Sequence, residues 1–170
     1  MDQTVFFSEK QRFTQAWLWI LLSGITAFSI FGMIRQVCLG QVFGQKPMSD
    51  SGLILLVVFL LLLDYLFFSF RLETEIRTDG IYVRFFPFHL KSRYYAWDQL
   101  AQVYVRQYQP LSEYGGWGIR GFGRNRALNV SGNKGIQLET LDGARLLIGT
   151  NKAEEVSELL KRLGYWRQKH

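Results

Sequence analysis

Two long hydrophobic stretches dominate the first 70 residues of the chain. Residues 16–34 carry no charged side chain, and residues 52–70 carry only Asp64. A helix of this length extends about 28 Å at about 1.5 Å of rise per residue, close to the roughly 30 Å hydrocarbon core of a bilayer. The pattern therefore predicts two helices that each cross a membrane.

The second stretch is hydrophobic enough to insert despite its acidic residue. Its Leu, Ile, Val and Phe residues favour insertion by about 4 to 9 kcal/mol in total, whereas one Asp near the centre of a span opposes it by about 3 kcal/mol. We interpret Asp64 as a carboxylate that faces the neighbouring helix and accepts a hydrogen bond from Ser23 or Thr26. A proton or ion relay is the alternative, although neither stretch offers a second ionisable side chain as its partner.

A short polar connection joins the two hydrophobic stretches. Residues 35–51 contain Gly40, Gly44 and Pro47, which favour a loop. A link this short makes the helices antiparallel neighbours, with both chain ends on the same side of the membrane. Because the chain after the second stretch is basic, we expect a multi-pass protein of the cell (plasma or inner) membrane, with both termini in the cytoplasm.

Hydrophobic and polar positions alternate from residue 71 onward, which is the period of a β-strand. Asp79-Gly80 and Asp142-Gly143 each separate two alternating runs, and such pairs are the strongest short signal for a β-hairpin. Further alternating runs lie at residues 92–97, 101–108, 116–120 and 127–132. Short strands at this spacing favour a small barrel or sandwich.

The hydrophobic period changes again near the C-terminus. An apolar stripe follows the spacing of one helix face and is made of Val156, Leu159, Leu160 and Leu163. Gly164 is a favourable residue to end such a helix. Because the opposite face mixes acidic and basic residues, we expect this helix to close the β domain rather than to lie on a membrane.

This order of elements and two segments of the chain carry a resemblance to a known family. The segment YYAWDQLAQVYV at residues 94–105 has an aromatic-x-Trp-acidic-x-aliphatic pattern that leads into a strand, and residues 113–138 are rich in glycine and arginine. The chain resembles uncharacterised bacterial two-span membrane proteins with a pleckstrin-homology-like (PH-like) domain. The resemblance implies a partly open barrel capped by a helix, and it implies no established reaction.

The sequence therefore predicts an α+β membrane protein in four parts. A two-helix transmembrane hairpin precedes a PH-like small β-barrel or sandwich, which a C-terminal α-helix caps. The four parts are an N-terminal cytoplasmic segment (1–15), the hairpin (16–70, with helices at 16–34 and 52–70), the PH-like domain (71–165) and a tail (166–170).

A basic and aromatic loop within the predicted β domain is the strongest candidate for a binding site. The chain carries 20 Lys and Arg against 14 Asp and Glu, a formal net charge of +6. The candidate loop contains Trp117, Arg120, Phe122, Arg124 and Arg126. Guanidinium groups bind phosphate through paired hydrogen bonds, and aromatic rings suit a headgroup interface. The loop could therefore bind anionic lipid headgroups or an acidic surface of a protein partner, and a solvated basic turn is the alternative.

The sequence gives little support for catalysis, a metal or a cofactor. Residues 116–121 match G-x-G-x-x-G, but no helical pattern follows them, as a dinucleotide site requires. The lone cysteine, Cys38, and the two histidines, His89 and His170, lack the spacing of a metal site or a nucleophilic triad. A net charge of only +6, without a recognised binding motif, also argues against a nucleic-acid partner.

We therefore expect a non-enzymatic, membrane-anchored interaction module that binds a protein partner or anionic lipid at the cytoplasmic membrane face. The alternative is an accessory subunit of a larger membrane complex that assembles through the transmembrane hairpin. In either function the lipid bilayer is one partner of the chain. The other partner is a second protein or another copy of the chain.

Overall fold

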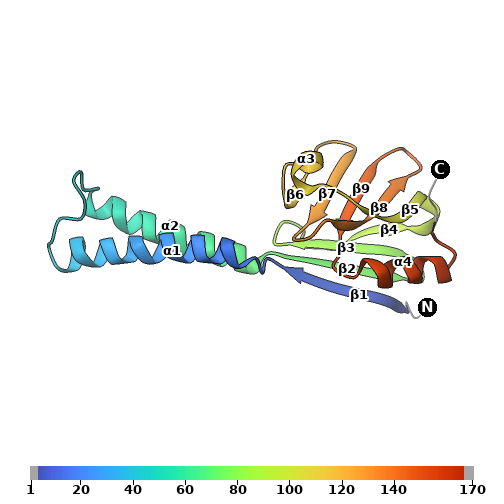
Figure 1. Cartoon of the computed structure of the whole chain (residues 1–170), viewed down its shortest axis with the longest axis horizontal. Coiled ribbons are helices and arrows are strands. Elements are labelled where there is room, and N and C mark those ends of the chain that lie inside the picture. The colour runs from blue at the N-terminus through green and yellow to red at the C-terminus, as the bar shows by residue number, and fades with distance from the viewer. Residues whose placement is uncertain (1–3, 167–170) are drawn as a thin grey trace. The chain divides into compact units, whose positions relative to one another are not determined.

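The computed structural model describes residues 4–166, and the chain folds into two compact units (Figure 1). The helical unit spans Thr14–Ser69, whereas the β unit combines the residues up to Phe13 with those from Phe70 onward. The helical unit is therefore an insertion between the first and second strands of the β unit. Of the predicted tail at residues 166–170, all but Trp166 lies outside the described residues.

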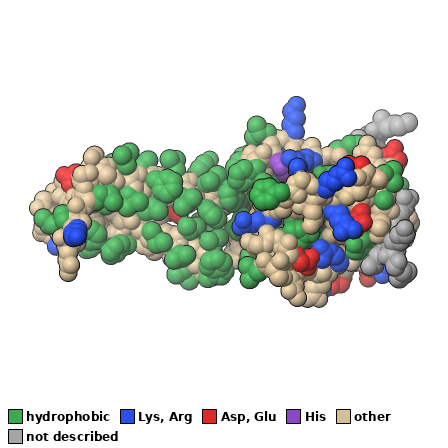
Figure 2. Space-filling model, turned by 90° about the horizontal axis from the view of Figure 1, so that it is seen from above, with side chains coloured by type: hydrophobic (Ala, Val, Ile, Leu, Met, Phe, Trp, Pro, Cys, Tyr) green, Lys and Arg blue, Asp and Glu red, His purple; other side chains and the backbone are tan. Residues whose placement is uncertain are grey.

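Two long helices make up the helical unit. Helix α1 (Ala16–Met33) continues into the π-helical turn η1 (Ile34–Cys38), and α2 (Asp50–Ser69) follows the connecting loop. The first helical segment spans 23 residues and the second 20, with mean hydropathies of 1.9 and 2.5 in their most apolar parts. Both are long and apolar enough to cross a membrane, as the hydrophobic pattern predicts, and hydrophobic side chains cover their visible surface (Figure 2).

The two helices approach each other through small and polar side chains of α1. The buried residues of the pair are Thr26, Ser29 and Gly32 on α1, with Leu53 and Val57 on α2. A Cβ atom on Gly32 would lie 2.6 Å from Cε1 of Phe43, a residue of the connecting loop. The absence of a side chain at Gly32 therefore lets the aromatic ring of the loop pack directly against α1.

The first sheet is an antiparallel meander of four strands in chain order: β1 (Val5–Arg12), β2 (Arg71–Arg77), β3 (Gly80–Phe86) and β4 (Arg93–Ala96). Strand β1 lies within residues 1–15, for which the sequence predicts no strand. Its inward positions are Phe7, Glu9 and Gln11. Because only Phe7 of these is hydrophobic, the strand leaves no alternating hydrophobic pattern to detect.

Buried polar contacts tie β1 to the second sheet. The Glu9 carboxylate accepts hydrogen bonds from Thr150 Oγ1 (2.5 Å) and from the Asn151 backbone N–H (2.9 Å). Gln11 Nε2 donates to the carbonyl of Gly149 at 2.7 Å. Such contacts compensate the cost of burying polar groups, so a strand with a polar inner face can still belong to the core.

The second sheet has five strands in the order β5-β8-β9-β7-β6. Their bounds are β5 (Leu100–Gln107), β6 (Gly118–Arg120), β7 (Asn125–Asn129), β8 (Lys134–Thr140) and β9 (Arg145–Gly149). All neighbours are antiparallel except β7 and β9, which run parallel. A 3-10 turn, η2 (Trp97–Gln99), connects the two sheets, and the short helix α3 (Pro110–Tyr114) follows β5.

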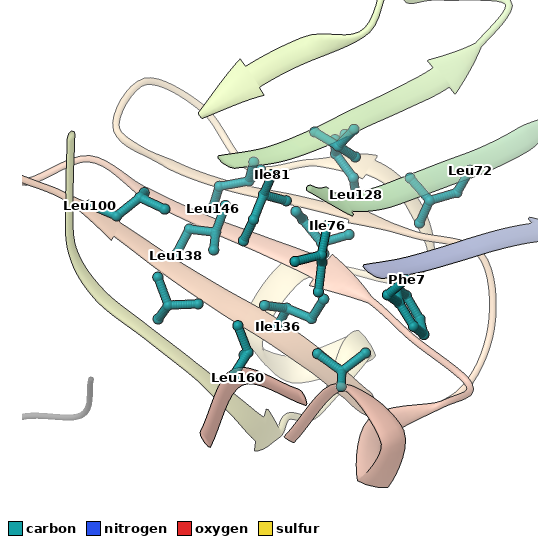
Figure 3. Close-up of a cluster of buried hydrophobic side chains, with 14 of the residues drawn as sticks. Phe7, Leu72, Ile76, Ile81, Leu100, Leu128, Ile136, Leu138, Leu146 and Leu160 are labelled. Atoms are coloured by element: carbon teal, nitrogen blue, oxygen red, sulfur yellow. The ribbon is translucent and has the colours of Figure 1, made fainter. Parts of the chain in front are cut away.

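The two sheets share one hydrophobic core, which helix α4 (Ala153–Arg162) also joins (Figure 3). The first sheet contributes Leu72, Ile76 and Ile81, the second contributes Ile136, Leu138 and Ile148, and α4 contributes Val156 and Leu160. The prediction of an α+β chain with a C-terminal helix is confirmed. Of the barrel and the sandwich that the strand pattern allows, the described residues form two packed sheets and no closed barrel.

Candidate functional site

The predicted binding loop is the hairpin that connects β6 to β7. Phe122 at its tip is 96% exposed. Gly121 before it has a φ of +79°, and a Cβ atom there would lie 2.1 Å from the carbonyl oxygen of Asn125. Only glycine fits this turn, which directs Phe122 away from the core. Trp117 is placed differently: it is half-buried, and its Nε1 donates to the carbonyl of Gly132 at 3.0 Å.

The arginines of this hairpin are exposed and only partly used in local contacts. Arg120 Nε donates to the carbonyl of Trp117 at 2.8 Å, and Arg126 Nε donates to that of Gly123 at 3.0 Å. These bonds match the solvated-turn alternative in part. However, they leave the terminal nitrogens of both guanidinium groups available, and no described residue forms an ion pair with Arg120, Arg124 or Arg126.

The structure brings a second segment, the β3–β4 connection, to this hairpin. His89 and Arg93 line the same small cavity as Phe122 and Arg126. Exposed apolar side chains also occur in this connection, because Phe88 is 58% and Leu90 is 77% exposed. We call the combined surface the basic-aromatic patch, defined by Phe88, His89, Leu90, Lys91 and Arg93 with Arg120, Phe122, Arg124 and Arg126.

The β3–β4 connection leaves the first sheet at the end where the helices join it. In the register of that sheet, Arg71 at the start of β2 lies opposite Arg12 at the end of β1 and Phe86 at the end of β3. Phe70 is the one residue between α2 and β2, and its ring centroid lies 5.4 Å from that of Phe88. The chain connectivity therefore places this part of the patch next to both helix attachments.

Cations of the patch differ from most other cations of the β unit because they form no ion pair with a described residue. Cations outside the patch form seven ion pairs with acidic side chains: Lys10–Glu73, Arg84–Glu73, Arg77–Glu75, Arg106–Glu113, Lys134–Glu154, Arg145–Glu139 and Lys152–Glu155. At the edge of the patch, hydrogen bonds from Thr140 and the Ala144 N–H, with the charge of Arg124, lower the pKa of Asp142. The patch thus keeps a positive field that an external anion can use.

His89 adds a neutral donor to these cations. Its Nδ1 accepts a hydrogen bond from the Phe85 backbone N–H at 3.3 Å, which leaves Nε2 to carry the proton of the neutral ring. Partial burial and the positive charges of Arg93 and Arg126 lower the pKa of His89. Since its ordinary value is already below 7, His89 is neutral at pH 7 and still donates through Nε2.

Of the two residues predicted to donate a hydrogen bond to Asp64, Thr26 does so and Ser23 does not. Thr26 Oγ1 donates to Asp64 Oδ2 at 2.8 Å, whereas Ser23 Oγ donates to the carbonyl of Trp19 at 2.6 Å. The second carboxylate oxygen, Oδ1, is buried and has no hydrogen-bond partner among residues 4–166. The same residues contain no group of His, Cys, Asp and Glu that could hold a metal ion.

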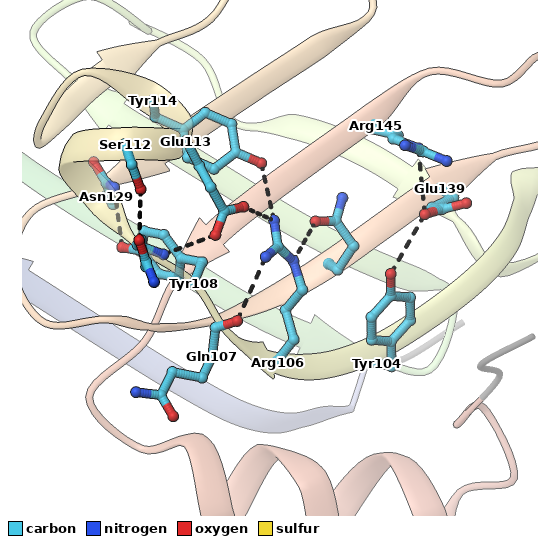
Figure 4. A network of polar contacts seen from close by, with 12 residues as sticks. Tyr104, Arg106, Gln107, Tyr108, Ser112, Glu113, Tyr114, Asn129, Glu139 and Arg145 are labelled. Atoms are coloured by element: carbon cyan, nitrogen blue, oxygen red, sulfur yellow. Dashed lines mark hydrogen bonds and ion pairs between the residues drawn. The ribbon is translucent and has the colours of Figure 1, made fainter. Parts of the chain in front are cut away.

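A second polar cluster, which the sequence did not reveal, lies on the outer face of the second sheet (Figure 4). Arg106 on β5 donates to Glu113 Oε2 (2.8 Å) and Tyr114 Oη (3.2 Å) on α3, and to Gln137 Oε1 (3.0 Å) on β8. Beside it, Asn129 Nδ2 donates to the buried Tyr108 Oη at 2.9 Å. Because these groups satisfy one another, we assign the cluster the role of holding α3 on the sheet.

Comparison with known proteins assigns no identity to this arrangement. No protein-family model matches the chain, and no curated protein matches it. The chemistry available to the patch therefore follows from its own side chains. Guanidinium groups without carboxylate partners bind anions, and exposed aromatic and aliphatic tips favour contact with an apolar phase. The combination fits the interface between lipid headgroups and acyl chains.

Proposed function

We propose that this protein is a non-enzymatic, membrane-anchored module whose β unit binds anionic lipid headgroups at the cytoplasmic membrane face. One observation carries the proposal: the basic-aromatic patch combines highly exposed apolar side chains with cations that form no ion pair among residues 4–166. The exposed side chains of Phe122 and Leu90 suit a headgroup layer, where aromatic and aliphatic groups contact the boundary of the acyl chains.

Membrane insertion of the helical unit is part of the same proposal. The two apolar helices supply the anchor, and the chain joins them to β1 and β2 at the end of the first sheet from which the β3–β4 connection leaves. The four-stranded meander, the second sheet and the closing helix α4 support a PH-like assignment for the β unit. Both termini then lie in the cytoplasm.

The energetics favour a lipid surface as the ligand. Each Lys or Arg near an anionic membrane contributes about 1 kcal/mol, and full burial of a side chain the size of Phe or Leu contributes about 1.5 to 3 kcal/mol. These contributions need no matching pocket, and tethering through α1 and α2 raises the effective concentration of lipid at the patch. An acidic protein surface would use the same charges but would gain less from tips as exposed as Phe122.

Hydrogen–deuterium exchange of the full-length chain in lipid discs tests this proposal. We expect the backbone of residues 86–93 and 119–126 to exchange more slowly in discs that contain phosphatidylglycerol than in discs of phosphatidylcholine alone. Arg120→Glu with Arg124→Glu should remove the difference. The matched control, Lys152→Glu just before α4 with Arg162→Glu at its end, makes the same charge change away from the patch and should retain the difference.

Equal exchange in the two kinds of disc would overturn the lipid assignment. That result would favour the alternative function, an accessory subunit of a larger membrane complex, in which the helical hairpin makes the contacts. A high-salt condition adds an internal check. Salt screens exposed charges, because the Debye length falls from about 10 Å at 0.1 M to about 3 Å at 1 M, so it should weaken the protection.

A further inference from the structure

A small cavity lies within the basic-aromatic patch, between the β3–β4 connection and the β6–β7 hairpin. Its volume is about 160 Å³, and the buried side chains of Leu128 and Leu146 form part of its lining. Three nitrogen-bearing side chains also line it: His89, Arg93 and Arg126. No Asp or Glu occurs among the described lining residues, so the cavity presents donors without a competing carboxylate.

Each of the three nitrogen-bearing side chains retains donors for a ligand. Arg126 uses Nε for the carbonyl of Gly123, which leaves its two terminal nitrogens. The Arg93 side chain has neither a hydrogen bond nor an ion pair with any described residue. His89 presents Nε2–H, because Nδ1 already accepts from the Phe85 N–H. The cavity therefore gathers two guanidinium groups and one imidazole N–H.

We propose that this cavity binds the phosphate monoester group of a membrane lipid, between Arg93 and Arg126 with His89 as a third donor. The inference rests on the proposed lipid-binding function and names its preferred headgroup. A phosphate monoester offers three terminal oxygens and carries about −1.5 to −2 charges at pH 7. Two guanidinium groups and one N–H match that set of acceptors better than they match a singly charged diester.

The number of terminal oxygens also favours a monoester. A phosphodiester headgroup, such as that of phosphatidylglycerol, carries a second substituent on phosphorus, so it offers one terminal oxygen fewer to these donors and less charge. A monoester, such as that of phosphatidic acid, can enter end-on while its acyl chains remain outside. Phe122, which also lines the cavity and is 96% exposed, then lies where it can contact those chains.

Native mass spectrometry of the full-length chain, released from discs with equal amounts of phosphatidic acid and phosphatidylglycerol, tests the preference. We expect bound phosphatidic acid to exceed bound phosphatidylglycerol by about tenfold. Arg93→Gln with Arg126→Gln should reduce this ratio to about one. The matched control, Arg120→Gln with Arg124→Gln, removes the same charge from the patch but not from the cavity, and should lower both lipids while preserving the ratio.

Other outcomes separate this inference from the proposed function. Enrichment of both anionic lipids over phosphatidylcholine without a preference between them would overturn the monoester site and leave lipid binding intact. No enrichment of either would overturn both. Displacement of phosphatidic acid by millimolar inorganic phosphate would assign the cavity to a soluble phosphate ligand and overturn the lipid source. We expect retention instead, because a lipid in the same membrane has a high effective concentration.

Discussion

The outer face of the second sheet and the basic-aromatic patch use arginine and aromatic residues in opposite ways. On the sheet face, Arg106 is held by Glu113, Tyr114 and Gln137, and every bond stays within the β unit. In the patch, Arg93 and Arg124 form no ion pair with any residue that the structure describes, and Phe122 is almost fully exposed. The difference separates a cluster whose polar groups satisfy one another from a surface whose donors stay available.

The positions of acidic residues along the sequence account for part of this difference. Both segments of the patch come from stretches without a single acidic residue, 80–97 and 114–138. Arg106 also lies in such a stretch, 99–112, but Glu113 directly follows it, and the short helix α3 brings the two together. Only the fold could show that the β3–β4 connection and the arginine-rich hairpin meet.

The largest effect expected to distinguish the two regions is a change in the free energy of unfolding. Arg106→Leu removes the donors that satisfy Glu113, Tyr114 and the buried Gln137, so we expect it to lower the free energy of unfolding by about 2 to 3 kcal/mol. Arg126→Leu, in the patch, should change it by no more than about 0.5 kcal/mol. Urea titration of the full-length chain in a non-ionic detergent, followed by circular dichroism, measures both.

A comparable loss in the two variants would show that the arginines of the patch serve the fold, and the contrast between the regions would disappear. Arg106→Lys provides a control for charge alone. A lysine keeps the attraction to Glu113 but cannot donate to three acceptors in the fixed geometry of a guanidinium group. It should therefore recover only part of the stability.

Much of the fold could be predicted because hydrophobic periodicity determines its local elements. The apolar runs gave both long helices, Asp79-Gly80 and Asp142-Gly143 gave the hairpins β2–β3 and β8–β9, and the stripe from Val156 gave α4. Strand β1 escaped detection because it buries Glu9 and Gln11. The parallel pairing of β7 with β9 also escaped, since it joins strands that are not consecutive and depends on tertiary contacts.

The candidate site was predicted only in part. Arg120, Phe122, Arg124 and Arg126 do share one exposed hairpin, but Trp117 packs against the backbone near Gly132. The missing half of the patch, with His89 and Arg93, lies about 30 residues earlier in the chain. No spacing rule connects segments that far apart, because their approach results from the packing of the two sheets.

A smaller effect is expected when the tip of the patch is made acidic. Phe122→Glu removes an apolar side chain and places a carboxylate beside the arginines of the hairpin. We expect binding of the full-length chain to anionic lipid to weaken by about tenfold, the equivalent of roughly one charge and a lost apolar contact. Stability should not change, because the side chain is 96% exposed. A matched control, Val5→Glu, alters an exposed apolar residue at the end of β1 opposite to that of Arg12, away from the patch, and should leave lipid binding intact.

The smallest expected effect concerns the pH dependence of the cluster around Arg106. The hydrogen bond from Arg106, with a further one from the Gln109 N–H, lowers the pKa of Glu113. A lowered pKa means that Glu113 stabilises the fold above its ordinary titration range, and that this contribution is lost as the pH falls through its folded pKa. Because Glu113 is partly exposed, the contribution should not exceed about 1 kcal/mol.

Glu113→Gln should therefore be less stable than the unsubstituted chain at pH 7, and the difference should vanish in acid. A difference that persisted in acid for Glu113→Gln would mean that packing of α3, rather than charge, holds the cluster together.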